Sequence, residues 1–118
     1  MNSDKFEFGV SNTMREVPPG TEAIISFNGE HKIVETEWGS KYSFPILIHR
    51  HDSYSNLDEP LVATWQSKAA CAKQLVEGLE NKNDLSWHKE LLEHYNNSKW
   101  QLTRFDTGSY YISVLKDD

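Results

Sequence analysis

The chain has 118 residues, 37% of them hydrophobic, and its formal net charge is −6. This length suits one compact domain, and the acidic balance argues against a protein whose whole surface grips duplex DNA, because basic patches dominate such surfaces. The only cysteine, Cys71, excludes an intramolecular disulfide and a zinc site of several cysteines. The N-terminus has no apolar signal core and no apolar run is long enough for a bilayer, so we expect a cytoplasmic protein without a membrane segment.

The charges are unevenly distributed along the chain. Residues 77–94 contain five acidic and two basic residues, whereas residues 60–76 and 95–105 contain two basic residues each and no acidic one. A chain that is acidic as a whole therefore keeps the capacity for a locally basic face. Net charge alone does not exclude a groove for a single strand of nucleic acid.

The first marked boundary in the chain is Pro18-Pro19-Gly20, because two prolines fix φ and remove two backbone donors. We expect residues 1–19 to form an N-terminal arm and residues 20–118 to form a single domain. Within the arm, residues 5–10 alternate in a way that predicts a short strand with its two phenylalanines on one face.

Residues 21–27 are predicted to form a strand that leads into Asn28-Gly29. Asn-Gly is the favoured pair for a tight type I′ hairpin. A glycine there also lets one long strand bend through a bulge, which is how a small closed barrel turns a corner. Both interpretations stay open on the sequence. The strand pattern continues over residues 31–38 and, after Gly39, over residues 41–50.

The rest of the chain carries strand, helix and turn signals in succession. Pro45 cannot donate a hydrogen bond to a sheet, so that point of strand 41–50 should be a bulge or an edge. Residues 61–65 form a short strand, Ser67 is a plausible helix N-cap, and Asp84 or Ser86 caps a second helix. The apolar stripe of the first helix comprises Ala72, Leu75, Val76 and Leu79. The last two strands are expected at residues 99–105 and 109–116.

Aromatic side chains and a lysine crowd the turn around Gly39. Unpaired bases stack on aromatic rings and phosphates attract cations, so this combination suits a single-stranded nucleic acid. The same rings also suit the core of a small barrel. Strand alternation puts Tyr42 and Phe44 on the same face as Ile46, which favours a core role for Phe44.

The stretch Thr36-x-x-Gly39-x-x-Tyr42-x-Phe44, which enters an apolar strand, resembles the first hairpin of single-stranded DNA-binding OB domains of the archaeal and replication-protein-A type. The order of elements over residues 20–116 is similar to that of the OB-fold, a five-stranded Greek-key barrel. The resemblance implies a mainly β chain with helices, forming a five-stranded OB-type barrel with a helical insertion between strands three and four. It also implies binding to single-stranded DNA or RNA without catalysis and without a cofactor or metal.

The resemblance places Trp38, Lys41, Tyr42 and Phe44 at the groove on the first two strands, followed by Trp65 and Lys68 on the third strand and the start of the helix. A further candidate, Arg104, is added because its strand has aromatic and no acidic neighbours, and guanidinium pairs with phosphate or stacks on bases. For the two tryptophans at strand ends, Trp65 and Trp100, burial in the core is the ordinary alternative. The predicted nucleic-acid-binding residues are Trp38, Lys41, Tyr42, Trp65, Lys68 and Arg104.

Two features favour other functions. The acidic helix at 84–96 and the N-terminal arm suit a protein-interaction module, in which Glu35 and Glu37 would repel nucleic acid. His49 and His51 share a strand face beside Asp52, which is a weak signal for a metal ion. The sequence contains no glycine-rich phosphate loop and no nucleophile elbow, so we expect no enzyme.

Overall fold

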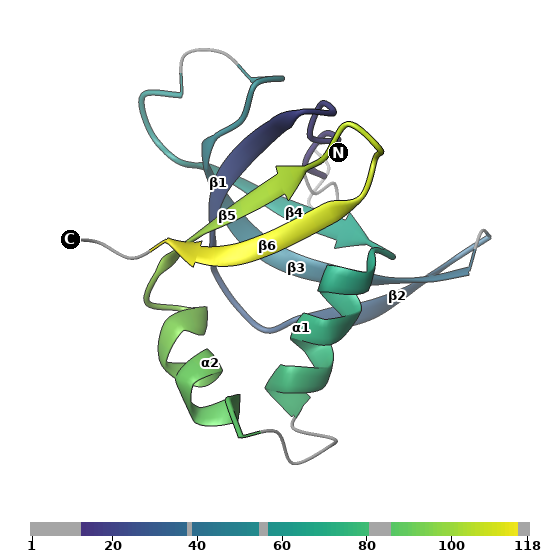
Figure 1. Cartoon of the computed structure of the whole chain (residues 1–118), viewed down its shortest axis with the longest axis vertical. Helices are drawn as coiled ribbons and strands as arrows, with labels where there is room; N and C mark the ends of the chain where they lie inside the picture. Colours follow the sequence, from purple (N-terminus) through teal and green to yellow (C-terminus); the bar gives the residue numbers. More distant parts are fainter. Residues whose placement is uncertain (1–12, 38, 55–56, 81–85, 116–118) are drawn as a thin grey trace, which may run out of the picture.

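The computed structural model describes residues 13–37, 39–54, 57–80 and 86–115. Within these residues the chain forms a mainly β structure with a six-stranded sheet and two helices (Figure 1). The helices lie between the fourth and fifth strands in chain order. The elements are β1 (Thr21–Phe27), β2 (Lys32–Thr36), β3 (Gly39–Arg50), β4 (Leu61–Ser67), α1 (Ala70–Glu80), α2 (His88–Tyr95), β5 (Lys99–Arg104) and β6 (Tyr110–Leu115).

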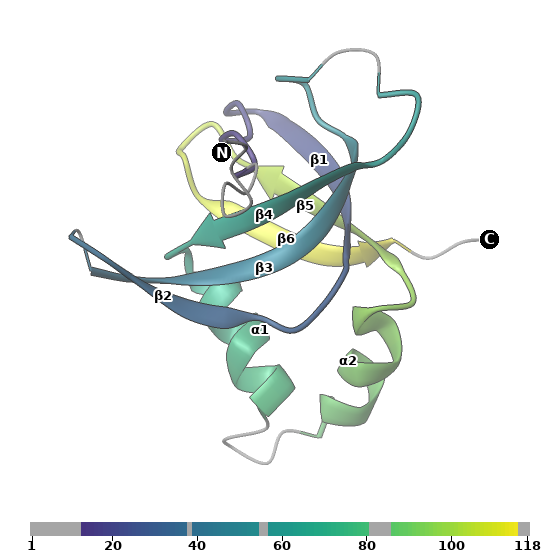
Figure 2. The same ribbon diagram turned by 180° about the vertical axis from the view of Figure 1, so that it is seen from behind.

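The long strand β3 organises the sheet. One of its edges pairs first with β2 and then with β1, and its other edge pairs with β4 (Figure 2). Strand β1 continues the sheet to β5, and β5 pairs with β6. All these pairings are antiparallel, which lets one face of the sheet cover the core while the other faces solvent.

The segment Asn28-Gly29 does not form a tight hairpin. Both β1 and β2 run antiparallel to β3, with Phe27 opposite Ile46 and Lys32 opposite Ser43. They are therefore two parts of one bent strand, and the expected five strands become six. The N–H of Asn28 donates to the carbonyl of Pro45 at 2.8 Å. Pro45 of β3 thus lies opposite the gap between the end of β1 and the start of β2. Its missing N–H leaves no broken hydrogen bond, because no strand pairs with β3 on that edge at this point.

A closed five-stranded barrel is not confirmed. Among the described residues no pairing joins β4 to β6. Residues 13–18, here called the strap, lie on the β4 side of this gap, where Thr13 forms a parallel bridge with Thr64. Met14 and Val17 of the strap are buried in the same core as the sheet.

The core is built from the alternating inward residues of β1 and β3 together with aromatic rings. Phe44 is fully buried, which confirms the core role that strand alternation predicts for it. Its ring stacks on that of Trp65 at 5.1 Å, and Phe27 stacks on Tyr95 of α2 at 4.6 Å. Trp100 meets the ring of Phe27 edge-on. These rings pack the sheet against α2. Each large aromatic side chain buries a large apolar area, which compensates for the small number of hydrophobic residues in the chain.

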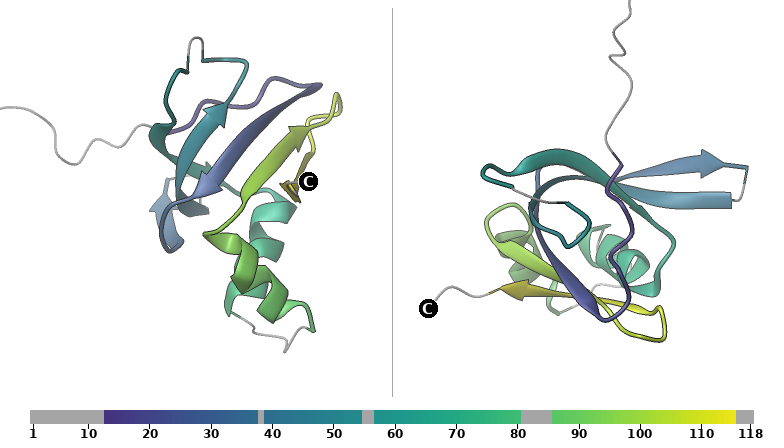
Figure 3. Two further views of the ribbon diagram at one scale, coloured as in Figure 1. Left: turned by 90° about the vertical axis from the view of Figure 1, so that its left-hand side faces the viewer. Right: turned by 90° about the horizontal axis from the view of Figure 1, so that it is seen from above.

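The two helices lie together at one end of the sheet (Figure 3). Helix α1 buries the stripe expected from its sequence, with Leu79 partly buried at its end. It begins at Ala70, and Ser67 is two residues too early to cap it: the Ser67 hydroxyl accepts a hydrogen bond from the N–H of Ala69. Helix α2 begins at His88 after Trp87, so Ser86 is not its cap, and Asp84 lies outside the described residues.

Candidate functional site

A cleft of about 660 Å³ opens beside the gap between β4 and β6. Four segments form its walls: the strap, the start of β3, the end of β4 with the first residues of α1, and the turn between β5 and β6. Its lining residues are Met14, Arg15, Glu16, Val17, Lys41, Trp65, Gln66, Ser67, Lys68, Ala69, Ala70, Gly108, Ser109 and Tyr110. The cleft therefore combines segments that are far apart in the sequence.

Three of the six predicted binding residues line this cleft, namely Lys41, Trp65 and Lys68. Trp65 contributes only its edge, because its side chain is 4% exposed and stacked on the core. Its surroundings favour the structural role over base stacking. Tyr42 is half-buried on β3 opposite Ser67 and packs against the core. Trp38 lies outside the described residues.

Two of the lining cations, Lys41 and Lys68, lie close to the turn between β2 and β3. A Cβ atom at Gly39 would meet the Lys68 Nζ at 3.2 Å, so the ammonium group lies over the Gly39 backbone. Gly39 has a φ of 109°, a backbone conformation that residues other than glycine rarely adopt. On the same hairpin the Glu35 carboxylate accepts a hydrogen bond from the Ser40 hydroxyl at 2.8 Å. This carboxylate is therefore held along the hairpin.

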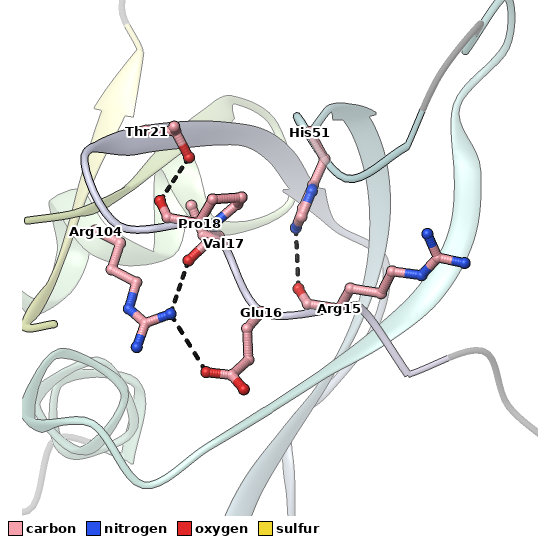
Figure 4. A network of polar contacts seen from close by, with 7 residues as sticks. All are labelled: Arg15, Glu16, Val17, Pro18, Thr21, His51 and Arg104. Atoms are coloured by element: carbon pink, nitrogen blue, oxygen red, sulfur yellow. Dashed lines mark hydrogen bonds and ion pairs between the residues drawn. The ribbon is translucent and has the colours of Figure 1, made fainter.

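Arg104 lies at the margin of the cleft, under the strap (Figure 4). Its Nη1 donates to the Val17 carbonyl at 3.0 Å and pairs with the Glu16 carboxylate at 3.3 Å. Its guanidinium lies 5.3 Å from the centre of the Tyr110 ring, as in a cation–π contact. The Arg104 Nε is buried and has no hydrogen-bond partner among the described residues. Burial raises the pKa of Tyr110 above its ordinary value, while the nearby Arg104 charge acts in the opposite direction.

A buried histidine holds the other side of the strap (Figure 4). His51 is 2% exposed, and its Nδ1 accepts a hydrogen bond from the N–H of Ser53 at 3.0 Å. The proton of the neutral ring is therefore on Nε2, which donates to the Arg15 carbonyl at 2.9 Å. The Arg15 Nη1 donates a hydrogen bond to the Ser53 carbonyl at 2.8 Å, and the Arg15 backbone N–H donates one to the Tyr54 hydroxyl at 3.0 Å.

We expect the free energy of unfolding to fall as the pH is lowered from about 7 to about 5, partly through His51. Burial lowers the pKa of His51 below 6.5, so below that pH the unfolded chain takes up a proton that the folded chain resists. Most carboxylates keep their charge in this window. Urea unfolding at several pH values checks this, and His51→Gln should flatten the slope because it keeps a donor for Arg15 but does not titrate. A variant with the full slope contradicts the assignment.

The sequence did not identify two groups of residues near the site. Arg15 and Glu16 precede the Pro-Pro-Gly boundary, so the sequence assigned them to the N-terminal arm outside the domain. In the structure both line the cleft. Phe105 and Tyr111 are about half exposed on the β5–β6 hairpin, with their rings 6.5 Å apart. Phe105 comes directly before the turn that lines the cleft, and an aromatic residue beside a Gly turn is the signal that could have found it.

A second, smaller cavity of about 340 Å³ lies between the two helices and β6. It is lined mainly by apolar and aromatic side chains, including Cys71. Burial raises the pKa of the Cys71 thiol, which disfavours the reactive thiolate. His49 and His51 do not converge, because His49 hydrogen-bonds the Ser26 hydroxyl at 2.8 Å. Across the described ranges no group of three or more His, Cys, Asp or Glu side chains could hold a metal ion.

The fold and site thus define a mainly β domain with an open six-stranded sheet and a cleft that contains lysines and an arginine. No helix within the described part of the chain is long and apolar enough to cross a membrane. Comparison with protein-family models, with curated proteins and with solved structures finds no match.

Proposed function

We propose that the chain is an OB-type domain that binds single-stranded nucleic acid in the cleft beside the β4–β6 gap. The observation that carries this proposal is that Lys41 and Lys68 line the cleft, while Arg104 contacts Glu16, Val17 and Tyr110 of its wall. The three cations come from β3, from the segment between β4 and α1, and from β5, in a chain whose net charge is −6. A local concentration of cations against the overall charge suits a polyanionic backbone.

An exposed aromatic ring beside the cleft would supply a stacking surface. Phe105 comes directly before the β5–β6 turn that lines the cleft, whereas Tyr111 follows the turn and lines the smaller cavity beside the helices. Bases show their π-faces to a protein only when they are unpaired and unstacked, so such rings favour a single strand over a duplex. Trp38, next to Gly39 in the sequence, lies outside the described residues and stays a candidate for the same role.

Titration of the protein with a labelled dT oligonucleotide, a mixed-sequence single strand and a matched duplex tests this function. We expect the single strands to bind at low salt and to lose affinity steeply as salt is added, because phosphate contacts release counterions. The duplex should bind more weakly under every condition. Intrinsic tryptophan fluorescence gives a label-free signal for the same titration. The proposal is wrong if no single strand binds at low salt.

A protein-interaction module is the second candidate. Helix α2 shows Leu92 to solvent, and Trp87 just before it is also exposed. Glu90 and Glu93 make this helix acidic, which suits a basic partner. Recovery of one stoichiometric partner from nuclease-treated lysate, together with no oligonucleotide binding at low salt, would favour this candidate over the first.

A further inference from the structure

We propose that the strap is an intramolecular competitor of nucleic acid, with the Glu16 carboxylate occupying the place of a backbone phosphate at Arg104. This inference rests on the proposed function and concerns the regulation of the same cleft. It follows from how the strap is held, from the donors that Arg104 leaves unused, and from the exposure of the ion pair between them (Figure 4).

The strap is fixed at its C-terminal end and lies along the cleft at its N-terminal end. The Gly20 N–H donates to the Arg104 carbonyl at 2.8 Å, and the Thr21 hydroxyl donates to the Pro18 carbonyl at 2.7 Å. Toward its start, the Met14 N–H donates to the Thr64 carbonyl of β4 at 2.7 Å. The segment therefore bridges the open edge of β4 and the β5–β6 hairpin. Any strand of nucleic acid that enters the cleft meets the strap as one of its walls.

Arg104 has hydrogen-bonding capacity that the strap does not satisfy. Both of its described polar contacts involve Nη1, while the buried Nε has no partner among the described residues. A Cβ atom at Gly108 would lie 3.8 Å from Nη2, so Nη2 lies beside the turn that lines the cleft. A guanidinium presents its donors as a planar fork that suits the oxygens of a phosphate. A phosphate in the place of Glu16 would bridge Nη1 and Nη2, whereas the described contact of Glu16 is with Nη1 alone.

The contact that must be displaced is a weak one. The Glu16 side chain is 82% exposed, and its oxygen lies 3.3 Å from Nη1. Exposed ion pairs of this kind contribute little to stability, because water screens them and both side chains lose freedom. The carboxylate can therefore leave without unfolding the strap, whose Met14 and Val17 remain anchored in the core. Removing its charge should raise affinity for nucleic acid while leaving the fold unchanged.

The test compares Glu16→Gln with Glu93→Gln in the full chain, with labelled dT oligonucleotide as the probe. Glu93 lies exposed on α2 and gives the same change in net charge away from the cleft. We expect Glu16→Gln to raise affinity about two- to fivefold at low salt, since an exposed pair is worth at most a factor of this order. The control variant should change affinity by less than half as much.

Arg104→Gln completes a double-mutant cycle, which separates local competition from general repulsion. If Glu16 acts through Arg104, the gain from Glu16→Gln disappears in the Arg104→Gln background. A gain that persists there, or an equal gain from Glu93→Gln, overturns the competitor while wild-type binding leaves the proposed function standing. If neither the wild type nor Glu16→Gln binds at low salt, the proposed function itself is overturned, and the competitor with it. Unfolding curves of each variant show whether the fold is intact.

Discussion

Replacing Phe44 by alanine is expected to lower the free energy of unfolding by about 3–5 kcal/mol. Phe44 is fully buried at the centre of β3, where it stacks on Trp65 and tilts against Phe27 at 5.5 Å. Removing the ring loses apolar burial and leaves a cavity that the surrounding rings cannot fill without leaving their own contacts. Urea unfolding followed by circular dichroism measures the change, independently of the tryptophan environment.

Phe105→Ala is the matched control for this prediction, since it removes the same ring from an exposed position after β5. Its effect should stay within about 0.5 kcal/mol, as for most surface substitutions. A loss at position 44 no larger than that at position 105 would show that β3 does not carry the core. The control variant also has a use in binding experiments, because Phe105 is one of the rings proposed to stack on bases.

Local pattern was enough to place most of the elements. The alternation of β3 correctly indicated an inward position for Phe44, since side chains in a strand change sides at every residue. The stripe of α1 likewise predicted its buried side. These signals are short-range, so they survive without knowledge of what packs against them. The element order also predicted correctly that the helices interrupt the strands.

Long-range pairing decided what the sequence left open. Asn28-Gly29 is chemically suited to a hairpin, and only the pairing of both flanking strands with β3 shows that the strand bends instead. Closure of the sheet depends in the same way on whether β4 meets β6, which no local signal encodes. Met14 and Val17 are buried although they precede two prolines, because a proline boundary ends a hydrogen-bonded element without ending packing.

The candidate site likewise contains residues that local pattern predicts and contacts that depend on long-range packing. The resemblance places Lys41 and Lys68 along one groove, and in the structure both line one cleft. Trp65 was predicted beside them, but its inward position on β4 places the ring in the core. Arg104 pairs with Glu16, which is far from it in the sequence. The local charge pattern of residues 95–105 therefore indicates a basic segment and contains no sign of this acidic partner.

Exchanging both cleft lysines for glutamine, Lys41→Gln with Lys68→Gln, is expected to weaken binding of single-stranded nucleic acid by about tenfold or more at low salt. Each lysine that neutralises a phosphate contributes roughly 0.7 to the slope of log affinity against log salt for a single strand. The double variant should therefore also show a slope that is smaller by about 1.4, if both contacts are made. Fluorescence anisotropy of a labelled dT oligonucleotide at four or five salt concentrations measures both quantities.

The slope distinguishes a contact from a change in net charge, and a second double variant makes the comparison direct. Lys73→Gln with Lys89→Gln removes the same charge from exposed positions on α1 and α2, outside the cleft lining. If that variant loses as much affinity and slope as the cleft variant, the cations act only through the overall field and the cleft is not the binding site. If only the cleft variant loses both, the phosphates lie between the β2–β3 hairpin and the start of α1.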